Sequence, residues 1–182
     1  MSGTDIGPGM CLIDRWLREK SKKNYDKNGT IAKSGKINKF ILNKLLENFY
    51  EKENILTKGP IQSFDTKYFN YSFVKDLSLE DGAATLTEFT AQIIISSLKK
   101  LNLHRKEIIL CGGGRKNNFL FEKLKKENPY IKLIDEYKVD GDFIESQAFA
   151  YLAIRSYLGK PISFPETTGV SKPCTGGLIF KN

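Results

Sequence analysis

The amino-acid sequence predicts an α/β fold in which helices flank a small mixed sheet. Two short runs, residues 108–111 and 131–134, have the length and the apolar character of buried strands. Each run is followed by apolar residues at helical spacing, so the order from residue 106 onward is strand, helix, strand, helix. The chain has 182 residues, 40% of them hydrophobic, which is enough for a single domain with a core of its own.

The first part of the chain predicts helices. Apolar residues at helical spacing predict one helix over residues 9–21 and another over about residues 36–49. The polar, glycine-containing stretch 22–35 between them is expected to be mostly loop.

The middle of the chain combines an irregular segment with the longest expected helix. Residues 50–77 carry an aromatic cluster, which we interpret as local packing. A long helix follows, because Ser78 and Asp81 are spaced as in a capping box. Its apolar stripe predicts that residues 84–101 pack on the sheet.

The last expected helix begins at Asp142 and continues to about residue 158. Its residues are apolar nearly all round the helix, so we expect it to be buried and packed on the sheet. Residues 160–182 are expected to be loop, with a terminal strand near residues 177–181.

Three consecutive glycines, Gly112, Gly113 and Gly114, follow the first expected strand and precede a helix. Glycines let backbone N–H groups approach a ligand closely, and the unpaired N–H groups of a helix start favour anions. The turn, with Asn117 at its end, therefore suits part of a nucleotide; a tight turn without a ligand explains the same residues equally well. The pattern is neither a dinucleotide-binding fingerprint nor a P-loop.

A second glycine turn, in the stretch DIGPGM, places Asp5 just before Gly7 and Gly9. A carboxylate beside unpaired N–H groups suits a general base next to a phosphate. A solvated aspartate at an ordinary turn is the simpler interpretation of these residues alone.

A third candidate site is the start of the last expected helix, where Asp142 and Glu145 lie one turn apart. The two carboxylates either line a cleft or interact with the positive end of the helix, and the sequence favours neither.

Composition restricts the classes of function. The net charge of +8 fits an anionic partner, but scattered lysines explain it better, and no basic stripe with interleaved aromatics indicates a nucleic-acid groove. No apolar run approaches the roughly 18 residues that span a membrane, and no signal peptide is apparent, so a cytoplasmic protein is predicted. The chain has three cysteines far apart in the sequence, Cys11, Cys111 and Cys174, and this odd number predicts reduced thiols. Their spacing and the presence of a single histidine, His104, predict no metal site.

Taken together, these stretches resemble the anhydro-N-acetylmuramic acid kinases, ATP-dependent sugar kinases of cell-wall recycling. DIGPGM resembles the family's D-T-G-P-G-N turn, with Ile6 and Met10 in place of Thr and Asn. LCGGGRKN resembles its C-G-G-G-x-x-N turn, ATLTEFTAQII its A-T-L-T-x-x-T-A helix, and DFIESQAFAYLAIR its D-x-x-E-A-x-A-F-A-x-L-A helix. The matches come in the family's order and correspond to its C-terminal half.

The resemblance implies a fold and a domain organisation. The family has the two-domain, ribonuclease-H-like fold of the actin-like ATPases, with ATP and sugar bound between the domains. Residues 1–182 are expected to be a single domain like the family's C-terminal domain, with the N-terminal domain missing. The first four residues, MSGT, repeat part of the family's first phosphate loop.

The resemblance also implies a reaction and site residues. The substrate is a small amino sugar, and Mg²⁺ accompanies ATP. Asp5 is the implied base, which activates water to open the 1,6-anhydro ring while O6 of the sugar receives the γ-phosphoryl group. Glu145 is implied to orient sugar or water. The residues implied at the phosphates are Gly7 and Gly9, and those at the adenosine are Gly112, Gly113, Gly114 and Asn117.

A half-length match sets an expectation for activity. One domain cannot close on itself to exclude water, so we expect weak or no turnover by the chain alone. The expected partners are a separate N-terminal half or a second copy of the chain. The alternative is a non-catalytic remnant or a partner-binding half-domain.

Overall fold

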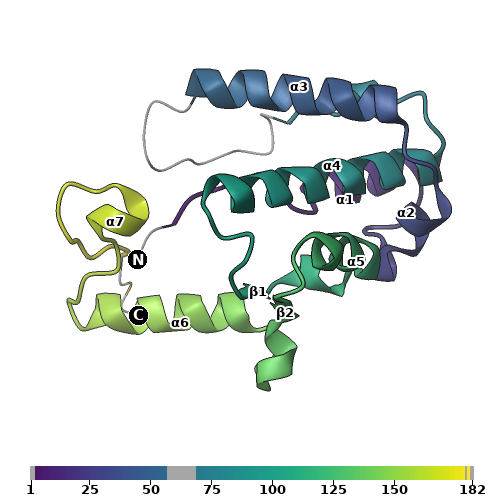
Figure 1. Cartoon of the computed structure of the whole chain (residues 1–182). Helices are drawn as coiled ribbons and strands as arrows, with labels where there is room; N and C mark the ends of the chain where they lie inside the picture. Colours follow the sequence, from purple (N-terminus) through teal and green to yellow (C-terminus); the bar gives the residue numbers. More distant parts are fainter. Residues whose placement is uncertain (1–2, 57–68, 179, 181–182) are drawn as a thin grey trace.

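The structure, a computed structural model, describes residues 3–56, 69–178 and 180 (Figure 1). It combines a helical body, formed by the first five α-helices, with a two-stranded sheet and a long, separate helix. The α-helices are α1 Cys11–Lys20, α2 Thr30–Ser34, α3 Lys39–Leu56, α4 Leu79–Lys100, α5 Asn118–Glu127, α6 Ile144–Tyr157 and α7 Pro165–Thr168. The strands are β1 Ile108–Leu110 and β2 Ile131–Leu133, and the 3-10 turns are η1 Lys27–Gly29, η3 Ser72–Val74, η4 Gly113–Lys116 and η5 Ile134–Tyr137.

Helix α4 is the centre of the hydrophobic core. It contacts α1, α2, α3 and α5, and its residues Leu86, Phe89 and Ile93 are buried. The predicted capping residue is confirmed, because Ser78 Oγ accepts a hydrogen bond from the Asp81 N–H at 3.1 Å. The Asp81 carboxylate does not complete a capping box but accepts from the Lys36 N–H at 2.7 Å, which ties the start of α3 to α4.

The segment expected to be loop, residues 22–35, contains η1 and α2, so this prediction is wrong. Asp26 explains the difference: its two carboxylate oxygens accept hydrogen bonds from the Ile31 and Ala32 N–H groups, each at 2.9 Å. These bonds satisfy the first backbone donors of α2 and allow Ile31 and Ala32 to be buried against α4. A carboxylate four residues before its helix is not a pattern that capping rules find.

The sheet confirms the α/β class and the two predicted strands. β1 and β2 pair in parallel, with Ile108 opposite Ile131, and α5 connects them. The described sheet is thus purely parallel rather than mixed. Of the expected terminal strand, residues 177, 178 and 180 are irregular, and the remainder lies outside the described residues. Ser163 and Cys174 instead form an isolated antiparallel bridge.

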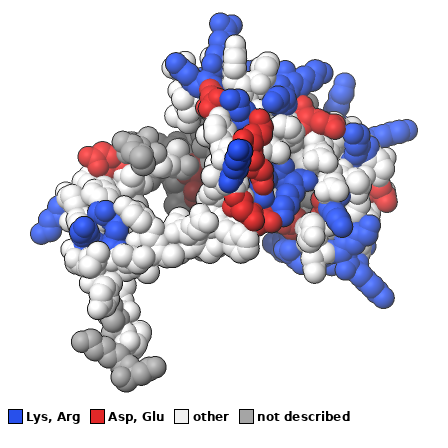
Figure 2. All heavy atoms as spheres, turned by 90° about the horizontal axis from the view of Figure 1, so that it is seen from below, with Lys and Arg blue, Asp and Glu red and all other residues white. Residues whose placement is uncertain are grey.

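Helix α6 is where the prediction of burial is wrong. None of its residues is buried, and it extends away from the helical body, with α7 near its far end (Figure 1). Phe149 is 64% exposed and Tyr157 is 72% exposed. An all-round apolar helix needs a partner on every face, and the described residues supply only partial cover. Figure 2, seen from the side on which α6 lies, shows a largely uncharged surface there, whereas Lys and Arg surround the helical body.

Within the described part of the chain, no helix is long and apolar enough to cross a lipid bilayer.

Candidate functional site

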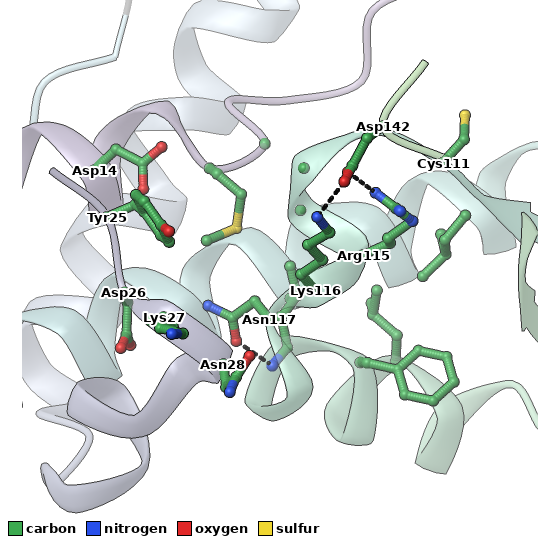
Figure 3. Close-up of a pocket in the computed structure, with 18 of the residues that line it drawn as sticks. Asp14, Tyr25, Asp26, Lys27, Asn28, Cys111, Arg115, Lys116, Asn117 and Asp142 are labelled. Carbon is green, nitrogen blue, oxygen red and sulfur yellow. Dashed lines mark hydrogen bonds and ion pairs between the residues drawn. The ribbon is translucent and has the colours of Figure 1, made fainter. Parts of the chain in front are cut away.

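A cavity of about 900 Å³ brings the two glycine turns together (Figure 3). Its walls are the turn before α1 and the first half of α1, the segment 24–28, the end of β1, residues 113–117, one face of α5, and Asp142. The volume lies within the range of small-molecule and nucleotide sites. Turns that are about a hundred residues apart in the sequence therefore line the same cavity.

The turn after β1 has the form of a ligand cradle. Gly112 has φ +75° and ψ 179°, a conformation that only glycine adopts readily. A Cβ atom on Gly112 or Gly113 would meet nothing within 4 Å, so the turn has an open face. Within the described chain, the N–H groups of Gly113 and Gly114 donate no hydrogen bond. Gly113 and Gly114 begin the 3-10 turn η4, and Gly112 is its N-cap residue.

Asn117 ends this turn and begins α5. Its Oδ1 accepts a hydrogen bond from the Leu120 N–H at 2.9 Å, so the side chain caps the helix. The residue is only 3% exposed, yet its Nδ2 has no hydrogen-bond partner among the described residues. Figure 3 shows the amide directed toward the side of the cavity formed by residues 24–28. A buried amide donor without a partner is rare, and here it lines a cavity.

The opposite wall comes from the start of α1. Gly9 has φ +55°, and its carbonyl accepts a hydrogen bond from Thr90 Oγ1 at 3.1 Å, which attaches the turn to α4. Asp14, one helical turn further, has a buried Oδ1 atom that no residue in the described part of the chain contacts by a hydrogen bond. Burial raises the pKa of Asp14, Arg18 opposes the rise, and Asp26 adds to it. Asp14 and Tyr25 both line the cavity (Figure 3).

Positive charge at the cavity comes from Arg18, Lys27, Arg115 and Lys116. Lys116 pairs with the Asp142 carboxylate, and within the described residues the Lys27 ammonium has no partner. The wall thus combines lysine ammonium groups with unpaired N–H donors, a combination that suits an anionic ligand with polar edges.

The structure brings some of the predicted site residues together and leaves others apart. Gly9, Gly113, Gly114 and Asn117 line the cavity, whereas Gly112, between the lining residues Cys111 and Gly113, does not. Gly7 packs on α4, where a Cβ atom would come 2.7 Å from Ile93 Cγ2. Asp5 lies in exposed coil before Gly9, and Glu145 is exposed in the first turn of α6; neither lines the cavity.

The sequence interpretation missed several cavity residues, among them Asp14, Tyr25 and Lys116. Asp14 lies in the first predicted helix, and helical spacing by itself does not mark a polar residue there as part of a site. Tyr25 and Lys116 are surface residue types in polar stretches, and only the folded chain shows that they share a wall. No group of three or more His, Cys, Asp or Glu in the described part could hold a metal ion.

Comparison with known proteins gives a consistent result. The family model for anhydro-N-acetylmuramic acid kinase matches residues 1–182. The chain is 53% identical over 185 residues to the anhydro-N-acetylmuramic acid kinase of Pelagibacter ubique (strain HTCC1062), covering 98% of this chain and 48% of that protein. It is 38% identical over 179 residues to the protein of that name from Zymomonas mobilis, covering 96% and 47%. The corresponding protein of Methylobacterium nodulans is 38% identical over 178 residues, with 97% and 46% covered. The chain therefore spans about half the length of the curated relatives it matches.

Proposed function

This chain belongs to the anhydro-N-acetylmuramic acid kinase family, and we propose that its cavity binds ATP as the nucleotide side of a sugar-kinase active site. The observation that carries the proposal is the turn of Gly112, Gly113 and Gly114. It presents N–H groups without a partner on the open face of a cavity of nucleotide size. The proposed architecture around it is the C-terminal domain of a two-domain, actin-like ATPase fold.

The nucleotide occupies the cavity with its adenosine by residues 112–117 and its phosphates toward Gly9. The unpaired amide of Asn117 supplies a donor on the adenosine side. Lys27 and Lys116 supply positive charge near the ligand. Such a site holds its ligand through backbone N–H groups and a few side chains, as glycine-rich nucleotide sites do.

The acceptor of the phosphoryl group is a small anhydro amino sugar. Asp5 takes a proton from water, the water adds at C1, the C1–O6 bond breaks, and O6 attacks the γ-phosphorus while ADP leaves. Asp5 lies four residues before Gly9, which lines the cavity, and in this proposal the base acts from the phosphate side. Glu145 orients sugar or water from the first turn of α6.

Magnesium fits this site only together with the nucleotide. Mg²⁺ in kinases is usually held by one or two carboxylates, water and phosphate oxygens. Near the cavity, Asp26 already caps α2 and Asp142 is paired with Arg115 and Lys116. Asp14 also lines the wall, and its Oδ1 has no hydrogen-bond partner in the part of the chain that the structure describes. When bound, Mg²⁺ neutralises phosphate charge during transfer.

A partner completes the site. The uncovered apolar surface of α6 and the half-length match together favour packing of α6 against the other half of the family chain. Relatives contain that half, and α6 begins two residues after Asp142, which lines the cavity. The second candidate, a partner-binding half-domain without catalysis, uses the same surface of α6.

ATP binding is tested by calorimetry on the wild-type chain and Gly113→Val. A Cβ at Gly113 would meet no atom within 4 Å, so we expect the fold to accept the larger residue and a ligand in the turn to be displaced. We expect Kd to rise at least about tenfold, the cost of losing one to two hydrogen bonds, with an unchanged melting temperature. Gly176→Val is the matched control away from the cavity, where a Cβ makes only an ordinary 3.5 Å contact. Equal affinity in wild type and Gly113→Val contradicts the proposal.

Catalysis is tested with a coupled ADP-release assay on anhydro-N-acetylmuramic acid. The chain is assayed alone and with the N-terminal half of the Pelagibacter ubique relative. We expect turnover only in the mixture, and a loss of roughly 10²–10⁴-fold with Asp5→Asn, the usual contribution of a general base. Association of the two halves without turnover supports the partner-binding candidate instead. Turnover by the chain alone shows that α6 needs no partner for catalysis.

A further inference from the structure

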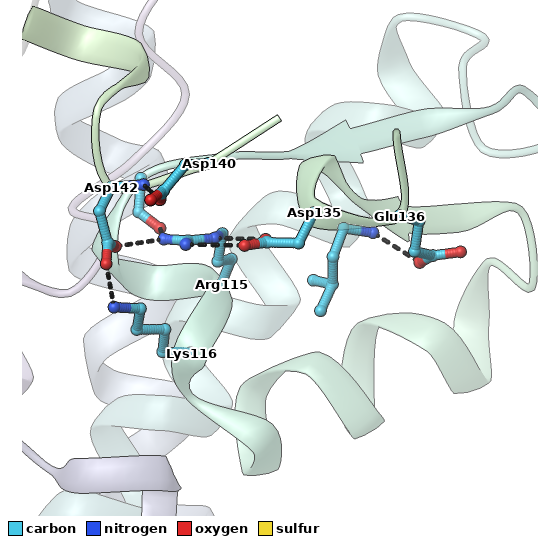
Figure 4. A network of polar contacts seen from close by, with 8 residues as sticks. Arg115, Lys116, Asp135, Glu136, Asp140 and Asp142 are labelled. Atoms are coloured by element: carbon cyan, nitrogen blue, oxygen red, sulfur yellow. Dashed lines mark hydrogen bonds and ion pairs between the residues drawn. The ribbon is translucent and has the colours of Figure 1, made fainter. Parts of the chain in front are cut away.

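Arg115 is a buried guanidinium inside the glycine turn. Only 5% of the residue is exposed, and its three nitrogens are all engaged (Figure 4). Nε and Nη2 donate to the two oxygens of Asp135 at 2.6 and 3.0 Å, a bidentate contact. Nη1 donates to Asp142 Oδ1 at 2.8 Å and to the Gly112 carbonyl at 3.0 Å. A cation buried in this way is held by two carboxylates and a backbone oxygen.

The contact with Gly112 sets the orientation of a peptide group. The Gly112 carbonyl accepts from the Arg115 backbone N–H at 3.3 Å as well as from Nη1. In a planar trans peptide the C=O and the following N–H point in opposite directions. Holding the Gly112 carbonyl toward the guanidinium therefore turns the Gly113 N–H away from it. Gly113 lines the cavity, and its N–H donates to no described residue.

One of the two carboxylates holds Arg115 from outside the cavity. Asp135 lies in η5, after β2, and is not part of the cavity wall. Gly141 packs against the guanidinium so closely that a Cβ atom there would come 2.3 Å from Nε. Asp142 also contacts Lys116, so changes at Asp142 alter the charge of the cavity directly. Asp135 is thus the position from which Arg115 can be disturbed without touching the ligand.

We propose that Arg115 is a positioning residue for the nucleotide: it fixes the Gly112–Gly113 peptide so that the Gly113 N–H faces the ligand, and Asp135 holds it in place. The inference rests on the proposed function, because it assigns a cause to the shape of the same turn. Arg115 does not touch the reacting atoms. It acts through one backbone carbonyl, and the carboxylate that orients it stands on the far side of the guanidinium.

The experiment compares Asp135→Asn with Glu136→Gln by calorimetry with ATP at a temperature well below unfolding. Both residues lie in η5, but among the described residues Glu136 accepts a hydrogen bond from the Leu133 N–H alone and makes none with Arg115. Asn keeps the size of Asp and one acceptor oxygen, so the turn remains folded. We expect Asp135→Asn to raise Kd about fivefold to tenfold, the scale of one loosened charge-assisted contact, and Glu136→Gln to change it less than twofold.

Two further readouts separate positioning from a merely structural role. In a double-mutant cycle, Asp135→Asn adds nothing to the Kd of Arg115→Lys, because both act through the same contact. The amide NMR signal of Gly113 shifts on ATP addition in the wild type and shifts less in Asp135→Asn. The inference is overturned if the wild type binds ATP and Asp135→Asn binds equally well, or if the two substitutions are additive. If the wild type binds no ATP, the proposed function falls as well.

Discussion

Gly82 of α4 lies directly against the indole of Trp16: a Cβ atom on Gly82 would come 2.4 Å from two ring carbons. Trp16 is fully buried, and its Nε1 donates to the Leu79 carbonyl at 2.9 Å, so the indole is fixed on the first turn of α4. This contact sets how closely α1 approaches α4, and thereby where the turn before α1 meets the cavity. Glycine is required here by packing and not by its backbone angles.

The first prediction is that Gly82→Ala destabilises the protein. In an ordinary helix interior this substitution stabilises by about 0.5–1 kcal/mol, because alanine has less backbone freedom to lose. Here overpacking against Trp16 outweighs that gain, and we expect a net loss of about 1–3 kcal/mol in the free energy of unfolding. Urea titration followed by tryptophan fluorescence measures it. A rise in stability would show that the indole moves aside at no cost.

The second prediction concerns the carboxylate that builds α2. Asp26→Ala removes the acceptors of the Ile31 and Ala32 N–H groups, which are then buried without partners. Each such group costs about 1–3 kcal/mol, so we expect a loss of about 2–6 kcal/mol for the two groups together. Asp76→Ala is the matched control, since Asp76 is exposed and makes no hydrogen bond or ion pair with the described residues. Equal effects of the two substitutions in thermal unfolding would contradict the capping role.

The third prediction separates the two functions of Asn117. Asn117→Asp keeps an oxygen for the Leu120 N–H and so retains the cap of α5, but replaces the unpaired Nδ2 donor with an acceptor. We expect little change in melting temperature and roughly a tenfold weaker affinity for ATP, about 1.4 kcal/mol for one lost donor. Asn117→Ala loses both the cap and the donor, and should lower both quantities. An affinity for ATP that Asn117→Asp leaves unchanged would mean that the amide does not face the nucleotide.

The elements with strong local signals could be predicted from the sequence. Apolar spacing located α1 and α4, the short apolar runs located β1 and β2, and Ser78 marked the start of α4. These signals suffice because each depends on neighbours in the sequence. The glycine turn after β1 was recognised for the same reason, since a strand, three glycines and a helix start are contiguous.

The remainder depends on contacts between distant residues. Asp26 caps α2 from a loop, and Arg115 is buried only because Asp135 and Asp142, 20 and 27 residues later, surround it. Aspartate and arginine are common surface residues, so the sequence alone does not predict that Asp26 caps a helix or that Arg115 is buried. The exposure of α6 could not be predicted for a different reason. An apolar sequence indicates that a helix packs against other apolar residues, but it does not show whether those residues belong to the same part of the chain. Whether Asp5 and Glu145 act in catalysis stays a prediction.

The last prediction is a pH dependence of stability through Asp135. The hydrogen bonds from Arg115 lower the pKa of Asp135 from its ordinary 3.8 to about 2. A carboxyl whose pKa is lower in the folded than in the unfolded protein stabilises the fold fully above the unfolded pKa, and this stabilisation is lost as pH falls toward the folded pKa. We therefore expect wild type to be more stable than Asp135→Asn at pH 5–7, with the difference shrinking between about pH 4 and pH 2. Thermal unfolding of both proteins across pH 2–7 measures it, and a difference that stays constant down to pH 2 would show that the charge of Asp135 is not what holds Arg115.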